Sequence, residues 1–578
     1  MGSRVGVAVI RATPTVWALV LAAVLLGPAL APGYVLSYDM VWVPDLALGR
    51  DVLGLGSALP RAIPSDAVVA ALDELVPGAL LQKIVLLGSL TAAGAGFGAL
   101  VRDRGLPARL VAVSLGVWNP FVVDRLLLGH WPLLIAYAVL PWLAVVLRGG
   151  DSGRWGARVP LLLVLGSLSA SAGLMTALVA LTAAGRSGLR RTLLLLAYVA
   201  GANAPWILAG LTSPASRTTD PVGAMVFRTG DEGLLPGPLA ALSFGGVWNA
   251  DVVPASRLGI AGVATTALLV AAALIGAVLV ARRRRTRPVP QLRAMALWWC
   301  VGWGLAAISW AAPQALGWWG AHVPAGGLVR DGSRMLALTV PLVVVLVAAS
   351  VDELLDRVPE VGARAVVAAV LALVPISLMP DAAGGADGRL DAVRYPTSYA
   401  DVRAAVAHAP SGDALSLPYV SYRAPAWNGY RRVLDPLPRY LDRTTVVNDE
   451  LVVSGRTVAG EDPRSVLVAA ALALPTPDER SLALREAGVS VVVTEEIEGY
   501  PVPALDGTTV HDGDLAVIVL GAASVRPLPR ARAAAMAVAW LMWSAVVLGP
   551  LGHLVQARRS PRRRRDGQAS DDAPGALP

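Results

Sequence analysis

The sequence predicts a polytopic α-helical membrane protein with about twelve transmembrane helices and an α/β domain near its C-terminal end. Of the 578 residues, 55% are hydrophobic and 16% are charged, whereas soluble globular proteins carry about 25% charged residues. Apolar runs of about 20 residues recur along the chain, and each is long enough to cross a bilayer core. The expected spans are 14–33, 79–101, 107–118, 131–147, 159–170, 172–185, 191–212, 258–281, 293–312, 335–351, 364–379 and 531–556.

Arginines between the apolar runs predict the orientation, because cytoplasmic loops of membrane proteins are enriched in basic residues. The arginine clusters all fall on one side only if residues 159–185 make two short passes, bending near Ser169 to Gly173. We therefore expect a plasma-membrane protein with both termini in the cytoplasm. Residues 29–31 (Ala-Leu-Ala) resemble a signal-peptidase site, but the polytopic pattern favours an uncleaved first helix. The net charge of +8 is explained by these anchors and does not indicate nucleic-acid binding.

The chain is expected to divide into four parts. They are a transmembrane region at 1–379, an extracytoplasmic α/β domain at 380–530, a final transmembrane helix at 531–556 and a disordered arginine-rich tail at 557–578. Within the α/β domain we expect strands at 414–419 and 489–494, a helix at 479–487 ended by Gly488, and a hairpin turn at Asp512-Gly513. Cys300 is the single cysteine, so this domain folds without an intramolecular disulfide.

No motif of a soluble enzyme is present in the sequence. The P-loop, the Rossmann glycine fingerprint, HExxH, CxxC and GxSxG are all missing. The lack of a nucleotide site argues against a primary pump. It also argues against a nucleotide-sugar donor bound to a Rossmann fold.

The loop after the first span carries the first candidate residues. Asp39 and Asp45 lie in SYDMVWVPD at the outer membrane interface, where a carboxylate can act as general base on an acceptor hydroxyl. The competing interpretation is that Asp39 caps a loop helix or faces water. Arg61 and Asp66 follow in a stretch that predicts an amphipathic surface helix capped by Ser65. Their charges are either structural or in contact with an acceptor.

Three further groups of charges lie at the expected outer membrane surface. Asp124, Arg125 and His130 lie on a short link at 119–130; the arginine and histidine suit a lipid phosphate, and the alternative is a local ion pair. Lys83 is the only lysine among 49 basic residues. It either snorkels to the interface or contacts a phosphate. Arg330, Asp331 and Arg334 precede the tenth span, and they either bind a phosphate or order the loop.

This arrangement resembles the GT-C class of membrane glycosyltransferases, and in particular the D-type arabinofuranosyltransferases of actinobacterial cell-wall biosynthesis. The resemblance covers about the first 380 residues. It is carried by Gly33 to Leu46, Asn119-Pro120, Pro141-Trp142 and the stretch Val329 to Arg334 before an apolar span. The spacing from Asp39 to Asp45 departs from that family's pattern. The LREAGVSVVVTEE stretch of the C-terminal domain is also similar to that of YfhO-like membrane proteins.

The resemblance implies transfer of a sugar from a polyprenyl-phosphate donor to a cell-envelope glycan or lipid acceptor. Asp39, with Asp45 as the second candidate, is then the catalytic carboxylate. The donor phosphate is held by cations drawn from Lys83, Arg125, His130, Arg330 and Arg334. The resemblance does not decide whether a divalent cation is needed, and the sequence contains no clear cluster of metal ligands. The aromatic residues Tyr419, Tyr422, Trp427 and Tyr430 are either sugar-stacking or core residues. The alternative functions are a non-catalytic assembly factor and a flippase or transporter of lipid-linked precursors.

Overall fold

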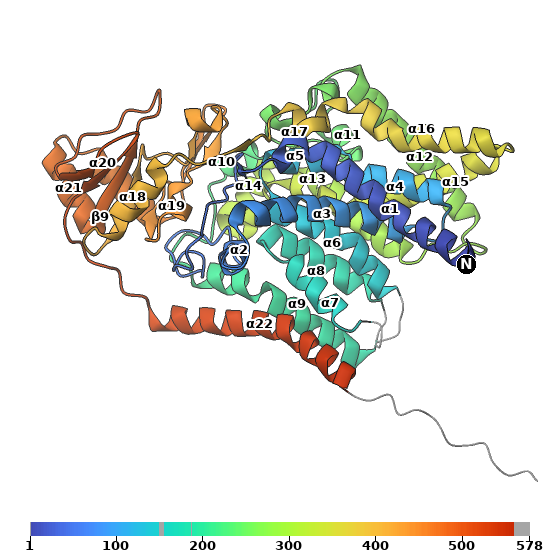
Figure 1. Ribbon diagram of the computed structural model, residues 1–578, viewed down its shortest axis with the longest axis horizontal. Coiled ribbons are helices and arrows are strands. Elements are labelled where there is room, and N and C mark those ends of the chain that lie inside the picture. Colours follow the sequence, from blue (N-terminus) through green and yellow to red (C-terminus); the bar gives the residue numbers. More distant parts are fainter. Residues whose placement is uncertain (1, 149–154, 186–187, 560–578) are drawn as a thin grey trace, which may run out of the picture.

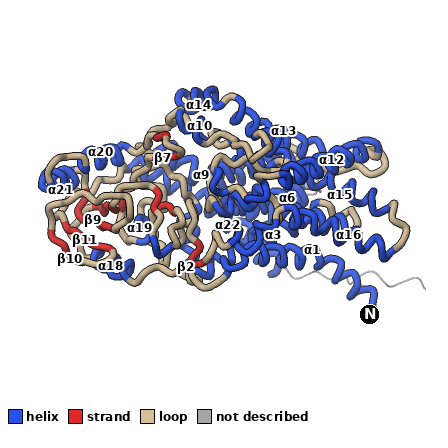
Figure 2. The backbone as a smooth tube through the Cα atoms, turned by 90° about the horizontal axis from the view of Figure 1, so that it is seen from above, coloured by secondary structure: helices blue, strands red, loops and turns tan. Residues whose placement is uncertain are grey.

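A computed structural model describes residues 2–148, 155–185 and 188–559 of the chain. Most of the predicted tail, residues 560–578, lies outside the described residues. Long helices form one bundle, and the strands gather at one end of it (Figure 1). The same arrangement is visible from the perpendicular direction (Figure 2). The helical bundle therefore meets the C-terminal region, which contains most of the strands, at this end.

A helix occupies each position at which a span was predicted. These helices are α1 (Gly2–Leu26), α3 (Gly78–Leu100), α4 (Leu106–Val117), α6 (Trp131–Leu147), α7 (Arg158–Leu165), α8 (Ala170–Ala183), α9 (Leu189–Thr212), α12 (Ile260–Arg282), α13 (Leu292–Ala311), α15 (Val340–Asp356), α16 (Val361–Leu378) and α22 (Arg530–Arg559). Shorter helices in the connections include α2 (Ser65–Asp73), α5 (Pro120–Leu127), α10 (Val222–Val226), α11 (Gly237–Leu242) and α14 (Pro313–His322).

Fewer of these helices are long enough to span a membrane than the sequence predicted. Within the described part of the chain, eight helices are long and apolar enough, or nine if the bent pair of the 3-10 helix η6 (Gly332–Leu338) and α15 is one span. The other three predicted spans, α6, α7 and α8, have 17, 8 and 14 residues. A helix of about 20 residues is needed to cross a bilayer. The predicted break near Ser169 is present, since α7 ends at Leu165 and the Ser169 side chain caps α8.

The spans differ in how much of their length is buried inside the protein, so that one is central and others are peripheral. The segment Leu106–Leu127, which comprises α4 and α5, is 94% buried, whereas Ile260–Arg282 is 17% and Val361–Leu378 is 6% buried. The helix restarts at α5 because the Asn119 side chain accepts from the amide of Val122 and Pro120 occupies the first turn. Residues 120–127, predicted as part of an outward link, are therefore a buried helix, and this corrects the prediction.

The C-terminal region contains a five-stranded sheet of order β10-β11-β9-β3-β6. The strands are β3 (Asp413–Leu417), β6 (Thr445–Val446), β9 (Val489–Glu495), β10 (Thr508–His511) and β11 (Leu515–Val519). Strand β9 runs parallel to β3 and antiparallel to β11. Helices α18 (Ser398–Ala407), α20 (Pro463–Leu472) and α21 (Pro477–Glu486) pack on the sheet. The predicted turn at Asp512-Gly513 joins β10 to β11.

The loop after α1 is joined to this C-terminal region by backbone hydrogen bonds. Strand β1 (Tyr34–Val35) pairs antiparallel with β2 (Ala392–Val393). Tyr38 forms a parallel bridge with Val433, and its amide donates to the carbonyl of Arg432 at 2.7 Å. The loop that carries Asp39 is therefore held at a fixed place between the bundle and the sheet. One detail of the loop differs from expectation: Ser65 is the first residue of α2 rather than its cap, and its hydroxyl donates to Ala62.

Candidate active site

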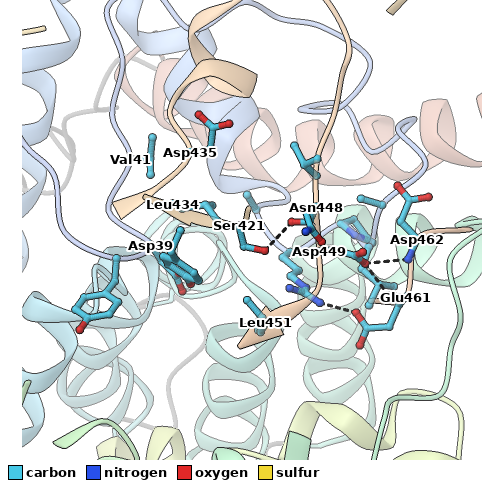
Figure 3. Close-up of a pocket in the computed structure, with 18 of the residues that line it drawn as sticks. Asp39, Val41, Ser421, Leu434, Asp435, Asn448, Asp449, Leu451, Glu461 and Asp462 are labelled. Carbon is cyan, nitrogen blue, oxygen red and sulfur yellow. Dashed lines mark hydrogen bonds and ion pairs between the residues drawn. The ribbon is translucent and has the colours of Figure 1, made fainter. Parts of the chain in front are cut away.

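A large cavity lies where the bundle meets the C-terminal region, and Asp39 and Glu461 both border it (Figure 3). Its volume is about 2230 Å³, whereas pockets for small ligands usually have roughly 300–1,000 Å³. Residues from the segments 38–66, 128–133, 206–251, 313–334 and 412–462 line it. Of the charged residues and histidines singled out from the sequence, the following line it: Asp39, Arg61, Asp66, His130, Arg330, Asp331 and Arg334.

The backbone around Asp39 is fixed by the link between α5 and α6. The Asp39 amide donates to the carbonyl of Leu128 at 3.1 Å. The hydroxyl of Ser37 donates to the carbonyl of Leu127 at 2.6 Å. These bonds place Asp39 beside His130, the residue before α6, although the two are 91 positions apart in the chain.

The carboxylate of Asp39 is held at both oxygens and still reaches the cavity. Nε2 of His130 lies 3.2 Å from Oδ2, and the hydroxyl of Tyr422 lies 2.5 Å from Oδ1. The side chain keeps 42% of its surface exposed. Burial raises the pKa of this carboxyl, but the hydrogen bonds from His130 and from the Tyr422 hydroxyl, together with the charge of Arg334, outweigh it. The pKa falls from 3.8 to about 2, so the group is ionised at neutral pH.

The tautomer of His130 follows from its second neighbour. Nη1 of Arg125 lies 3.3 Å from Nδ1 of His130. A guanidinium has donors only, so Nδ1 must accept this bond. The neutral ring therefore carries its proton on Nε2 and donates it to Asp39. Burial lowers the pKa of His130, which favours this neutral form.

Arg125 lies behind His130, outside the cavity lining, with 1% of its surface exposed. Its Nη2 donates to Oγ of Ser333 at 2.6 Å, and this hydroxyl donates to Asp331 Oδ1 at 2.6 Å. The guanidinium also pairs with Asp331 at 3.5 Å. A buried network therefore connects the loop before α15 to His130 and, through it, to Asp39.

Two arginines of that loop face the cavity. Nε of Arg334 donates to Asp331 at 3.0 Å, and 37% of its side chain is exposed. Arg330 stacks over the ring of Phe227 at 4.8 Å and lies 3.8 Å from Glu461. Burial and the neighbouring Arg61 lower the pKa of Arg330 to about 10. Both side chains therefore offer positive charge to an anion in the cavity at neutral pH.

Arg61 and Asp66 line the cavity but pair with the C-terminal region. Nη2 of Arg61 lies 2.5 Å from Oε2 of Glu461, and Nε of Arg439 lies 2.8 Å from Oδ2 of Asp66. Glu461 is buried. These two pairs favour the structural interpretation of both residues, because each closes the first loop against the sheet.

Three other sequence candidates lie outside the cavity lining. Asp45 is 66% exposed at its side chain and pairs with Arg403 at 2.9 Å. Lys83 lies on α3, and within the described residues its buried ammonium has no hydrogen-bond partner. Asp124 is buried within α5, beneath the surface at which it was expected. None of the three is placed to contact a ligand beside Asp39.

The aromatic candidates of the C-terminal region divide in the same way. Tyr419 and Tyr422 line the cavity, and their hydroxyls are engaged by Ser465 and Asp39. Trp427 packs against Tyr395 at 5.1 Å in an aromatic core. Tyr430 is 68% exposed and does not line the cavity. Two of the four aromatic residues therefore border the cavity.

Sequence reasoning missed Tyr422 and Glu461 as polar partners of the first loop. Tyr422 lies 383 residues after Asp39, and Glu461 lies 400 residues after Arg61. Nothing in the local pattern of either segment indicates such a contact. In the part of the chain that the structure describes, no three His, Cys, Asp or Glu side chains are grouped to hold a metal ion.

Comparison with solved structures places the fold. A cryo-EM structure of the arabinofuranosyltransferase AftD from mycobacteria matches 89% of this chain, with a TM-score of 0.52 and 18% sequence identity. The fold resembles that of AftD. A second structure, of an AftD point mutant, also matches 89% of the chain, with a TM-score of 0.53 and 17% identity. The match spans 40% of the length of AftD in the first structure and 41% in the second. The resemblance to the D-type enzymes is thus confirmed at the level of the fold.

No protein-family model and no curated protein matches the sequence. The similarity to AftD is therefore one of backbone architecture and not of shared sequence. What this chain does must be inferred from its own cavity.

Proposed function

We propose that the protein is a membrane glycosyltransferase that moves a sugar from a polyprenyl-phosphate donor to a cell-envelope glycan at the outer face of the plasma membrane. One observation carries the proposal: an ionised carboxylate, Asp39, and two arginines, Arg330 and Arg334, line the same cavity. Glycosyl transfer from a lipid phosphate needs a base for the acceptor and cations for the leaving group. The similarity of the fold to AftD supports the same assignment.

In the proposed reaction, Asp39 accepts the proton of an acceptor hydroxyl. The hydroxyl oxygen attacks the anomeric carbon of the donor sugar as the bond from that carbon to the phosphate oxygen breaks. The polyprenyl phosphate leaves with the electron pair, and the configuration at the anomeric carbon inverts. A carboxylate with a pKa of about 2 is a weak base. It suffices where the transition state resembles an oxocarbenium ion, because the hydroxyl becomes acidic only as the new bond forms.

Arg330 and Arg334 stabilise the departing phosphate. Both come from the loop before α15, and Arg334 is exposed enough to reach a ligand. Fixed cations in a partly enclosed site act strongly on a developing anion. No residue of the proposed mechanism requires a metal ion. Arg125 and Lys83, which the sequence offered for the same task, take no part in it, because neither lines the cavity.

The acceptor is proposed to be an oligosaccharide. A cavity of about 2230 Å³ exceeds the roughly 300–1,000 Å³ that a small ligand occupies. Its far wall is formed by the C-terminal region, where Asp449, Glu461 and Asp462 stand at one end (Figure 3). The Glu461 carboxylate is occupied by Arg61 and Arg330, so a glycan chain whose end reaches Asp39 would be met by the other carboxylate and carbonyl oxygens of this wall, which accept hydrogen bonds from sugar hydroxyls.

The test is transfer of labelled sugar from polyprenyl-phosphate donors in membranes that contain equal amounts of wild type, Asp39→Asn and Glu74→Gln. Glu74 is the matched control, because it is an exposed carboxylate of the same loop that does not line the cavity. We expect Asp39→Asn to lose activity by about 10²–10⁴-fold and Glu74→Gln to retain it. Equal transfer by all three removes Asp39 as the base. No transfer by the wild type with a broad donor set would favour a non-catalytic assembly factor or a flippase.

A further inference from the structure

We infer that the C-terminal region is part of the catalytic centre, with Tyr422 as a positioning residue that orients Asp39 opposite His130. This inference rests on the proposed function, since it assigns a role at the same carboxylate. It goes further in two respects. It makes a residue outside the helical bundle necessary for efficient transfer, and it gives the C-terminal region a task beyond holding an acceptor.

Tyr422 is rigidly held. It lies on β4 (Tyr422–Arg423), which pairs antiparallel with β5 (Val433–Leu434). The next residue, Arg423, has a fully buried side chain that bonds Glu495 at 2.9 Å and Asp435 at 3.0 Å. The hydroxyl of Tyr422 is thus presented by a hairpin that buried ion pairs anchor to the sheet. Because the Tyr422 hydroxyl is fixed in this way, its hydrogen bond restricts the movement of the Asp39 carboxylate.

The same hairpin also holds the backbone beside Asp39. The amide of Leu434 donates to the carbonyl of Tyr38 at 2.9 Å, and the amide of Tyr38 donates to Arg432 at 2.7 Å. Tyr38 adopts a φ of 45°, a conformation that a bulky residue takes up only where its surroundings impose it. The β4–β5 hairpin therefore holds both the backbone of the loop at Tyr38 and the carboxylate of Asp39.

Two donors on different oxygens fix the plane of the carboxylate. His130 approaches Oδ2 from the bundle, and Tyr422 approaches Oδ1 from the C-terminal region. The carboxylate keeps its remaining acceptor positions for the cavity, into which it is 42% exposed. Without Tyr422, only His130 restrains rotation of the carboxylate. Catalytic groups displaced by about 1 Å can lose about 10²-fold in rate.

A purely structural role of Tyr422 and a positioning role predict different effects of a substitution on stability and on kinetics. A tyrosine that only docks the C-terminal region would change stability and leave the chemistry of bound substrate intact. A positioning residue lowers kcat, leaves the donor KM unchanged and acts only while Asp39 is present. The charged and titratable groups that act on the pair are His130, Arg334, Arg61 and Arg439. All remain in place in a Tyr422→Phe variant, so the hydroxyl alone is tested.

The first experiment compares Tyr422→Phe with Tyr430→Phe in the full-length protein. Tyr430 is the control, because its side chain is exposed and does not line the cavity. We expect Tyr422→Phe to lower kcat on the order of tenfold with an unchanged donor KM, and Tyr430→Phe to match the wild type. The acidic limb of the kcat profile moves to higher pH in Tyr422→Phe, since the carboxylate loses a donor. An unchanged kcat and pH profile would overturn the role.

The second experiment does not depend on turnover. Thermal unfolding of wild type, Tyr422→Phe, Asp39→Asn and the double variant in detergent forms a double-mutant cycle. We expect the two changes to be non-additive in melting temperature, because both act on the same hydrogen bond: Tyr422→Phe removes its donor, and Asp39→Asn removes the charge of its acceptor. If the shifts in melting temperature are additive, Tyr422 and Asp39 do not interact, and the inference is wrong. If transfer is absent in the wild type while the cycle shows coupling, the proposed function fails, and the positioning role fails with it. Loss of transfer in Asp39→Asn but not in Tyr422→Phe rejects this inference alone.

Discussion

A Cβ atom on Gly129 would lie 2.0 Å from the amide nitrogen of Met40, the residue after Asp39. Gly129 also adopts a φ of +78°, a conformation that glycine reaches without cost. The link between α5 and α6 therefore meets the loop that carries Asp39 backbone to backbone, with no room for a side chain.

Gly129→Ala is expected to lower transfer by roughly 10²-fold, because the methyl group pushes the loop and its carboxylate away from His130. Activity at equal protein level and the melting temperature in detergent check this prediction. Gly88→Ala on α3 is the control, since nothing lies within 4 Å of its added Cβ. Wild-type activity in Gly129→Ala would mean that the position of Asp39 is not critical.

Removal of Arg125 is expected to destabilise the fold by about 1–3 kcal/mol, because buried Asp331 loses one of its two cationic partners, and Ser333 loses a hydrogen-bond donor. Thermal unfolding of Arg125→Met measures this loss. The double variant Arg125→Met, Asp331→Asn should recover part of it, since the second change removes the buried charge that has lost one of its two cationic partners. If the double variant is less stable than the single one, the pair at 3.5 Å is not what Arg125 contributes.

The buried His130 is expected to make stability fall in mild acid. Its folded-state pKa lies below the usual 6.5, so the unfolded chain binds a proton more readily, and stability rises with pH in the window below 6.5. Asp39 does not titrate there, because its pKa is about 2. Between about pH 7.5 and pH 5.5 the wild type should lose about 1 kcal/mol that His130→Gln does not lose. The exposed His408, changed to Gln, should leave the wild-type slope intact.

Asp45→Asn is expected to keep transfer at the wild-type level and to cost less than about 1 kcal/mol in stability, as exposed ion pairs do. Asp45 contacts Arg403 and not the cavity. Transfer and unfolding assays beside Asp39→Asn make the comparison. Loss of transfer in Asp45→Asn alone would reverse the assignment of the two carboxylates.

The positions of the long helices could be predicted from sequence because each depends on a contiguous apolar run. The break before α8 was predictable for a related reason, since only two short passes kept the arginine clusters on one side. Three of the twelve expected spans, α6, α7 and α8, are helices shorter than the length that crosses a bilayer. An apolar run shows that a segment avoids water, and it does not show whether lipid or protein surrounds it.

The link at 119–130 shows where local patterns mislead. Its charges predicted an interfacial loop, yet residues 120–127 are a buried helix. Asn119-Pro120 is a helix-start signal that could have been used. The burial of Arg125 could not be predicted, because its partners Ser333 and Asp331 lie more than two hundred residues away in the chain.

The candidate site was predictable only in part. Asp39, Arg330 and Arg334 were singled out by their placement next to apolar spans, and all three line the cavity. Tyr422 was predicted to be either a sugar-stacking or a core residue, and its bond to Asp39 was not foreseen. That bond depends on the pairing of Tyr38 with Val433. A pairing so distant in sequence leaves no periodicity within either segment.

The bridge between Tyr38 and Val433 has a consequence for biogenesis. Helices at the start of the chain emerge from the ribosome first and fold early, but the carboxylate between them finds its second donor only 383 residues later. During most of its synthesis the nascent chain therefore lacks the hydrogen bond from Tyr422 to Asp39. Under the proposed function, newly made bundle helices enter a membrane rich in lipid-linked sugars without consuming them, and competence begins only when the last quarter of the chain closes over the first loop.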